Sequence, residues 1–287
     1  MPVRDERRAE SPGELVLTVL ACGSAVVVFA VFAWIVGDIV RHGASEISWS
    51  FLVDPPSRAG RAGGISSVIV STLEILLVCL GVAVPIGVGA ALFLAEVARG
   101  GRFAGRLVRA GLDVLAGVPS IVSGLFGNAF FCVTLGLGFS ILSGGLTLAC
   151  MVLPLLTRSL ELGLRSVPDD YRMAAAALDL SSTRFFAQIL LPAAAPGLAA
   201  GLLLGIGRAM AETAALILTS GSVDRMPGSL LDSGRALSVH VYELAMNVPG
   251  GEARAYATAL VLVLLLVAIN LLSNTMVHRL VSPRVSA

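Results

Sequence analysis

The sequence contains no lysine, so all 20 of its basic residues are arginine. A phosphate-binding loop of the G-x-x-x-x-G-K-[ST] type requires a lysine, and this chain therefore has no such loop. Charged residues of all kinds make up only 14% of the 287 positions, compared with about 25% in an average soluble domain. If the protein uses ATP, another chain must hydrolyse it.

Cysteine, histidine and catalytic motifs are also scarce. The four cysteines stand inside apolar segments without C-x-x-C spacing, which gives little support for a metal site or a disulfide framework. The three histidines lie outside the predicted membrane spans, and neither H-E-x-x-H nor G-x-S-x-G occurs. We expect a chain that is not an enzyme and that holds no metal and no cofactor of its own.

Long apolar runs dominate the chain instead. Hydrophobic residues make up 56% of the sequence, and the mean hydropathy is +0.89. A helix that crosses a bilayer needs roughly 20 apolar residues. Six stretches reach this length: Leu15–Gly37, Ser66–Val97, Leu112–Leu137, Leu142–Leu164, Ala193–Leu218 and Tyr256–Val277. The sequence therefore predicts an all-α, multi-pass membrane protein with six transmembrane helices.

These spans divide the chain into consecutive parts. We predict an N-terminal tail over 1–14, a first transmembrane helix over 15–40, a connection over 41–65, a core of five further helices over 66–280 and a C-terminal tail over 281–287. The apolar part of the first helix is longer than the roughly 7 to 15 residues of a signal peptide. We therefore expect it to be retained as an anchor.

The arginines are distributed unevenly between the two sides of the membrane. In the six-span arrangement, 13 arginines fall on the side of both termini and 6 on the opposite side. Short loops rich in arginine stay in the cytoplasm. Both termini are therefore predicted to be cytoplasmic, and the connection over 41–65 is predicted to be periplasmic.

An arginine and a glutamate interrupt the fifth span, in the stretch GIGRAMAETAALIL at 205–218. On an ideal helix Arg208 and Glu212 share a face with glycines at four-residue spacing, which mark where another helix approaches. We therefore expect both charges to face into the bundle. The lipid side is expected to carry Leu202, Leu203, Ile206 and Ile217.

Two interpretations of this pair stay open. A charge at the centre of a bilayer costs on the order of 3 kcal/mol unless it is paired or hydrated. A buried ion pair would fix the register of the helix. We favour a hydrophilic pathway, in which the forked donors of Arg208 suit an oxyanion and Glu212 holds the arginine in place. The hydroxyl of Ser120, next to a proline in the third span, would add to such a pathway.

A polar segment between the fourth and fifth spans, residues 166–192, has the pattern of a cytoplasmic helix-turn-helix. Pro168 and the two aspartates after it suit a first helical turn, and the alanines of 174–177 continue the helix. Ser181 or Ser182 can cap a second short helix. Such a unit on the membrane surface predicts a docking element for a cytoplasmic partner.

The spacing of this segment resembles the EAA loop of bacterial ABC importer permeases, which reads E-A-A, three residues, G, nine residues, I-x-L-P. The matching positions are Ala174, Ala175, Ile189, Leu191 and Pro192. Met173 stands where the family has glutamate, and Asp179 stands where it has glycine. Aspartate adopts a left-handed conformation less readily than glycine, so we expect docking to be weakened or differently tuned.

Further segments between Gly63 and about Leu280 resemble PstA-type permeases of phosphate-specific importers. They include GVPSIVSGLFG, VPDDYRMAAAAL and RAMAETAALILTSG. The last corresponds to a family pattern R-x-x-G-E-T-A-P, in which Arg208, Glu212 and Thr213 match. Ala211 replaces the glycine of that pattern, and Ala215 replaces its proline.

The resemblance implies an ABC permease of the MetI-like fold in the bacterial inner membrane, importing inorganic phosphate. Its partners would be membrane lipid, a PstC-type sister permease, a PstB-type ATPase dimer that holds ATP and Mg, and a periplasmic phosphate-binding protein; no nucleic acid is expected. Arg208, Glu212 and Thr213 would line the substrate pathway. The EAA positions, with Tyr171, Arg172 and Leu178, would form the ATPase-coupling loop.

Two other functions remain open from the sequence. A permease for another oxyanion, such as sulfate, molybdate or phosphonate, would need the same arginine in its pathway. A secondary transporter or channel would also explain the charged pair within the span. That class would not need the cytoplasmic helix-turn-helix, and the sequence has no inverted repeat that favours it.

Overall fold

The computed structural model describes residues 12–98 and 103–281, and most of them lie in helices. The outer parts of both predicted tails lie outside these ranges. So do six of the arginines used to predict the orientation: Arg4, Arg7, Arg8, Arg99, Arg102 and Arg284.

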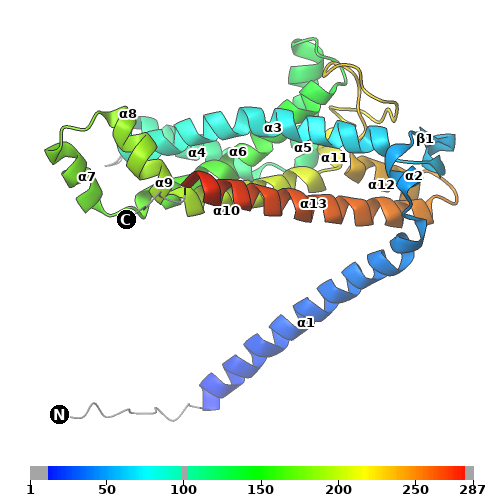
Figure 1. Cartoon of the computed structure of the whole chain (residues 1–287), viewed down its shortest axis with the longest axis horizontal. Helices are drawn as coiled ribbons and strands as arrows, with labels where there is room; N and C mark the ends of the chain where they lie inside the picture. Colours follow the sequence, from blue (N-terminus) through cyan, green and yellow to red (C-terminus); the bar gives the residue numbers. More distant parts are fainter. Residues whose placement is uncertain (1–11, 99–102, 282–287) are drawn as a thin grey trace.

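Four long helices form an elongated bundle (Figure 1). They are α3 (Ser66–Leu92), α6 (Ile141–Arg165), α10 (Ala195–Ala211) and α13 (Glu252–Val281). α6 is more buried than α3 and α13, because α3 and α10 both pack against it. The core between them is apolar and includes Ile75, Leu148, Leu156, Ile206 and Leu216.

Small residues let these helices approach closely. Gly145 of α6 lies against Val78 of α3, where an added Cβ would be 2.5 Å from the valine Cβ. Further along α6, Gly163 lies against Gly197 of α10, and a Cβ on Gly197 would be 2.7 Å from the carbonyl oxygen of Ser159. Close backbone contact of this kind is what holds helices together in lipid, where apolar burial between helices gains little.

The number of spans agrees with the predicted six when bent helices are counted as single spans. Four single helices are long and apolar enough to cross a bilayer: Val16–Glu46, Ser66–Val97, Ile141–Arg165 and Glu252–Met276. Two bent pairs complete the set: Phe103–Gly117 with Ser120–Thr134, and Thr183–Ala193 with Ala195–Ala211.

The third predicted span, over 112–137, is not one continuous helix. α4 (Phe103–Gly117) and α5 (Ser120–Gly127) meet at 107°, and α5 then turns away from the bundle axis (Figure 1). Pro119 causes the break, because the residue before a proline is disfavoured in a helix. Pro85 and Pro154 lie inside continuous helices.

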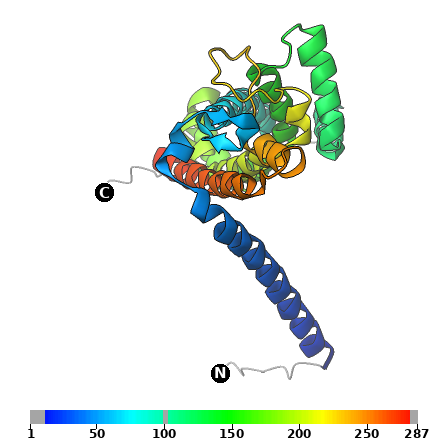
Figure 2. The same ribbon diagram turned by 90° about the vertical axis from the view of Figure 1, so that its right-hand side faces the viewer.

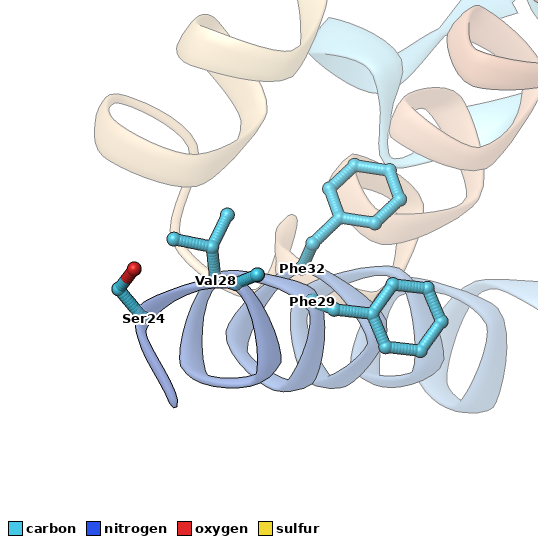
Figure 3. A pocket seen from close by; sticks show the side chains of 5 residues that line it. Ser24, Val28, Phe29 and Phe32 are labelled. Carbon is cyan, nitrogen blue, oxygen red and sulfur yellow. The ribbon is translucent and has the colours of Figure 1, made fainter. Parts of the chain in front are cut away.

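Helix α1 (Pro12–Gly43) stands apart from the bundle (Figures 1 and 2). It meets α13 only near its own C-terminal end, where the ring of His42 packs 5.0 Å from that of Tyr256. Residues 16–35 are all exposed. A shallow apolar depression on α1 is lined by side chains of that helix alone, among them Val28, Phe29 and Phe32 (Figure 3).

Short elements close the two ends of the bundle. One end, which we call the hairpin end, carries η1 (Ala44–Glu46), α2 (Trp49–Val53), η2 (Arg58–Gly60), α12 (Leu237–Met246) and an antiparallel hairpin of β1 (Pro56–Ser57) and β2 (Ala62–Gly63). The other, the α7 end, carries α7 (Asp169–Ala177), α8 (Ser182–Phe185), α9 (Leu191–Ala193) and the π-helices η3 (Phe93–Val97) and η5 (Phe186–Leu190). The π-helix η4 (Asn128–Thr134) continues α5, and α11 (Ala214–Ile217) follows α10.

A buried histidine holds the hairpin end together. His240 of α12 is fully buried, and its Nδ1 lies 3.2 Å from Nη1 of Arg235. Its Nε2 has no hydrogen-bond partner among the residues that the structure describes, and its ring packs against Gly60, whose φ of +85° suits glycine. Burial lowers the pKa of His240 to about 4, helped by the charge of Arg235 and opposed by Asp224. The fold therefore requires the neutral imidazole.

Substituting Gly197 with valine is expected to destabilise the bundle by about 1 to 3 kcal/mol, because the new side chain would meet the backbone of α6. Gly81→Val is the matched control, since a Cβ on Gly81 of α3 meets nothing within 4 Å. Thermal unfolding of the purified protein in detergent measures both variants. Equal unfolding temperatures for the two variants would contradict this description of the α6–α10 contact.

Acidification is expected to destabilise the hairpin end through His240. Because the folded pKa is lowered, the stabilisation is complete above the unfolded value of about 6.5 and is lost as the pH falls towards 4, by on the order of 3 kcal/mol. Unfolding temperatures of the wild type and His240→Gln, measured between pH 7 and pH 4, test this. The unfolding temperature of the variant should depend less on pH than that of the wild type. Parallel curves for the two proteins would contradict this role of His240.

Candidate functional site

The fifth predicted span is interrupted where its charged residues lie. α10 ends at Ala211, Glu212 takes an extended conformation with φ −71° and ψ 130°, and α11 begins only after Thr213. A continuous helix from 193 to 218 was therefore a wrong prediction at this point. Non-helical backbone at membrane depth is tolerated where it is buried in protein or lines a water-filled cavity.

The predicted ion pair forms across this break. Nη2 of Arg208 lies 3.5 Å from Oε1 of Glu212. The exposed fractions of the two side chains differ, at 44% for Arg208 and 12% for Glu212. The carboxylate therefore faces the interior of the bundle, and the guanidinium reaches its surface.

The face that carries Arg208 differs from the prediction. The glycines at 197, 201 and 205 pack against α6 as expected, but Arg208 lies at the edge of that face. Leu204, one turn earlier, is 56% exposed, whereas Ile206 is fully buried in the core instead of facing lipid. With 44% of its side chain exposed, Arg208 is only partly covered by the described part of this chain.

A serine from another element holds the unwound segment. The hydroxyl of Ser238, near the start of α12, donates a 2.6 Å hydrogen bond to the carbonyl oxygen of Glu212. The backbone N–H of the preceding Leu237 donates to Oγ1 of Thr72 in α3, at 2.9 Å. Sequence reasoning missed Ser238, because nothing in its local pattern marks a contact 26 residues away.

Helix α5 packs beside α11, the short helix that follows the unwound residues Glu212 and Thr213. Gly124 packs against Ala215 of α11, and Nδ2 of Asn128 donates to the carbonyl oxygen of Leu218 at 2.8 Å. Later residues of the α5 segment thus meet later residues of the α11 segment, so the two run in the same direction. Ser120, one turn before Gly124, therefore lies towards the Glu212 end of α11. Ser120 is half-buried. The fold thus brings the polar part of the third predicted span to the break in the fifth.

The helix-turn-helix at the α7 end forms as predicted. α7 and α8 are joined at Asp179, whose φ of +48° is the left-handed conformation that the family's glycine would adopt. Aspartate is one of the few other residues that take this conformation. The hydroxyl of Ser181 accepts from the backbone N–H of Arg184 at 3.4 Å, which caps α8. The replacement of glycine therefore leaves the turn intact.

The predicted coupling-loop residues divide into two groups. Ala175 is buried, and Ile189, Leu191 and Pro192 are half-buried against the bundle. Ala174 is exposed, as are three large apolar side chains, Tyr171, Met173 and Leu178, at 52%, 63% and 73%. An exposed apolar group of this size on a polar loop is typical of a docking surface.

Arg172 differs from its neighbours, because its side chain turns back towards the bundle and is only 15% exposed. Its Nη2 lies 2.7 Å from Oε1 of Glu96 at the end of α3. A hydrogen bond with that carboxylate raises the pKa of Arg172 above its usual value. Over residues 12–98 and 103–281, no group of three or more histidine, cysteine, aspartate or glutamate side chains is placed to hold a metal ion.

Comparison with known proteins gives a family and a fold. Residues 83–287 match the family of binding-protein-dependent transport system inner membrane components. The chain is 29% identical over 273 residues to the probable ABC transporter permease protein YqgI of Bacillus subtilis (strain 168), covering 89% of this chain and 92% of the relative. It is 32% identical over 264 residues to the phosphate transport system permease protein PstA 2 of Mycobacterium bovis (strain ATCC BAA-935 / AF2122/97), covering 90% and 86%.

A solved structure supports the architecture. A chain of the inward-facing MetNI methionine ABC transporter superposes with a TM-score of 0.56 over 75% of this chain and 96% of that chain. The sequence identity is 18%, so this likeness concerns the fold alone. The predicted MetI-like permease fold is thereby confirmed.

Replacing Ser238 with alanine is expected to lower the free energy of unfolding by about 1 kcal/mol, because the Glu212 carbonyl loses its partly buried donor. Ser166→Ala is the control, since Ser166 is exposed and bonds only to the helix it follows. Hydrogen exchange measured by mass spectrometry reports on the segment itself. Faster exchange over 209–218 is expected in Ser238→Ala, and exchange unchanged from the wild type would refute the role.

Proposed function

Because the chain belongs to the family of binding-protein-dependent transport system inner membrane components, we propose that it is the PstA-type permease subunit of an ATP-driven importer of inorganic phosphate. The observation that carries this proposal is Arg208, a half-exposed guanidinium beside unwound backbone within a membrane span. A forked guanidinium binds phosphate oxygens with two parallel hydrogen bonds. The phosphate transport named for the Mycobacterium bovis relative supports the choice of oxyanion.

The substrate pathway would run between this chain and a PstC-type sister permease. Arg208 and Leu204 lie on a side of α10 that the described residues leave partly exposed, at 44% and 56%. A charge facing lipid would cost on the order of 3 kcal/mol or more. A second permease against this side would remove that cost and enclose the guanidinium in a polar path. The isolated α1, exposed along most of its length, offers further surface to that subunit or to lipid.

Within the path, each residue of the site has a separate part. Arg208 would bind the phosphate, and Glu212 would orient the guanidinium and limit how tightly the anion is held. Thr213 and Ser120 would add hydroxyl groups near the break. The Ser238 hydrogen bond would keep the Glu212 backbone in its extended conformation.

ATP hydrolysis would take place on a PstB-type ATPase dimer that carries ATP and Mg. This chain has no lysine with which to build a phosphate-binding loop. The exposed side chains of Tyr171, Met173 and Leu178 would dock into that partner from the cytoplasmic side of the inner membrane. The arginine-rich connections support this orientation of the α7 end.

The hairpin end would then face the periplasm and receive the phosphate-binding protein. Its elements expose large apolar side chains, including Trp49 at 78% and Met246 at 70%. Both lie in the segments that connect the predicted spans on that side. Delivery at this end and coupling at the other fit the alternating access of an importer.

Substituting Arg208 with glutamine is expected to lower phosphate uptake by roughly 10- to 100-fold, the loss of a charged hydrogen bond worth about 1.5 to 3 kcal/mol. The assay is ATP-dependent uptake of labelled phosphate by proteoliposomes that contain the full complex and the binding protein. Excess sulfate should not compete. Arg158→Gln is the control, because Arg158 forms an exposed pair with Asp113 away from the break.

Each result of this assay has a distinct meaning. Uptake that is indifferent to Arg208 would make the Arg208–Glu212 pair a structural contact. An assembled complex that imports sulfate or another oxyanion in place of phosphate would overturn the proposed substrate.

A further inference from the structure

The end of α3 at the α7 end is built in an unusual way. Its last turn, η3, is a π-helix, in which the N–H of Ala98 bonds to the carbonyl oxygen of Phe93 at 2.8 Å. Single π-turns within helices are rare and often occur at functional sites. The carbonyl oxygen of Leu94 in this turn accepts hydrogen bonds from Nη2 of Arg165 at 3.0 Å and Nη2 of Arg109 at 3.5 Å.

A buried glutamate joins these two arginines. Glu161 of α6 is 8% exposed, and its Oε1 lies 2.9 Å from Nε of Arg165 and 3.1 Å from Nη2 of Arg109. Arg109 belongs to α4. The turn at the end of α3 is therefore tied to α4 and α6 through one carboxylate and one carbonyl.

The coupling loop reaches the same turn through Arg172. The guanidinium binds both carboxylate oxygens of Glu96 through one edge, from Nη2 to Oε1 at 2.7 Å and from Nε to Oε2 at 3.2 Å. Nη2 also donates to the carbonyl oxygen of Leu164 at 3.2 Å. Nη1 donates to Asp169 at 3.2 Å and to the carbonyl oxygen of Val167 at 2.9 Å. One side chain of α7 thus contacts the ends of both α3 and α6.

This link differs in kind from the apolar packing beneath the loop. Val167 and Leu190 pack with Ala91, Ala95 and Leu160 in a small hydrophobic cluster. A bidentate arginine–carboxylate pair adds two directed hydrogen bonds to this packing, so it has a defined distance and orientation. The Arg172–Glu96 pair therefore fixes where α7 sits relative to the end of α3.

A continuous set of contacts leads from this pair to the substrate path. α3 is a single helix from Ser66 to Leu92, and near its far end Thr72 accepts the N–H of Leu237. The neighbouring Ser238 holds the carbonyl of Glu212. The two ends of α3 therefore touch the coupling loop and the helix that supports the break.

We propose that Arg172 is a positioning residue that couples ATP hydrolysis to transport, by locking the coupling loop to α3 through Glu96. It touches neither nucleotide nor substrate. This inference rests on the proposed function, because it assumes that the loop docks on an ATPase. It assigns to Arg172 and Glu96 a role that differs from that of the exposed docking residues.

The test measures ATP hydrolysis and phosphate uptake in the same proteoliposomes, with the complete complex and binding protein. In Arg172→Gln and Glu96→Gln, the rate of ATP hydrolysis should stay within about twofold of the wild-type rate. The amount of phosphate moved per ATP should fall about tenfold. The exchanged pair Arg172→Glu with Glu96→Arg should recover much of the ratio that either single reversal loses. Arg158→Gln, from an exposed pair, is the control and should leave the ratio unchanged.

A second measurement does not depend on the substrate. Spin labels at Leu77→Cys in α3 and Leu264→Cys in α13, both exposed positions, report movement of α3 when ATP is added. The four native cysteines are replaced by alanine for this purpose. The distance change seen with wild-type Arg172 should be lost in Arg172→Gln.

The outcomes separate this proposal from the one on which it rests. A wild-type ratio of phosphate to ATP in Arg172→Gln, or a wild-type movement of α3 in that variant, would overturn the proposed coupling through the Arg172–Glu96 pair. Uptake and hydrolysis that fall together with the amount of assembled complex would also overturn it, since that is the effect of lost stability. A wild-type complex that moves α3 with ATP but imports no phosphate would refute the substrate while leaving the link supported.

Discussion

The close backbone contact of α6 with its neighbours is the constraint on which the other features of this protein depend. Helices in lipid gain little from apolar burial, so their association relies on close packing of small residues. Gly145 lies against α3, Gly163 against α10, and Gly144 against Ser220, which follows α11. With these contacts in place, α6 positions both the coupling loop that follows it and the unwound segment beside it.

This packing allows the fifth predicted span to be interrupted. The segment at Glu212 is tolerated because Ser238 satisfies its carbonyl group, and the carbonyl of Leu218 is satisfied by Asn128. Both donors come from elements that are distant in sequence. A bundle that satisfies irregular backbone in this way can present a charged side chain at the edge of a helix without unfolding the span.

Charged residues of the helices and the coupling loop lie in two places, the α7 end and the break at Glu212. At the α7 end, Arg109, Arg165 and Arg172 surround two carboxylates, Glu96 and Glu161, so that the ends of three helices and the loop are held in one network. Near the break, by contrast, Arg208 pairs with Glu212 and keeps 44% of its side chain exposed. The first arrangement suits transmission of force, and the second suits reversible binding of an anion.

Local sequence was sufficient for the features that depend on neighbours a few residues apart. The apolar runs predicted the spans, Ser181 predicted the cap of α8, and the four-residue spacing of Arg208 and Glu212 predicted their pairing. It was not sufficient for the 107° turn at Pro119, the partial exposure of Arg208 or the pairing of Arg172 with Glu96, 76 residues away. These depend on which helix covers which face, and that is decided by packing between segments distant in sequence, which no local periodicity records.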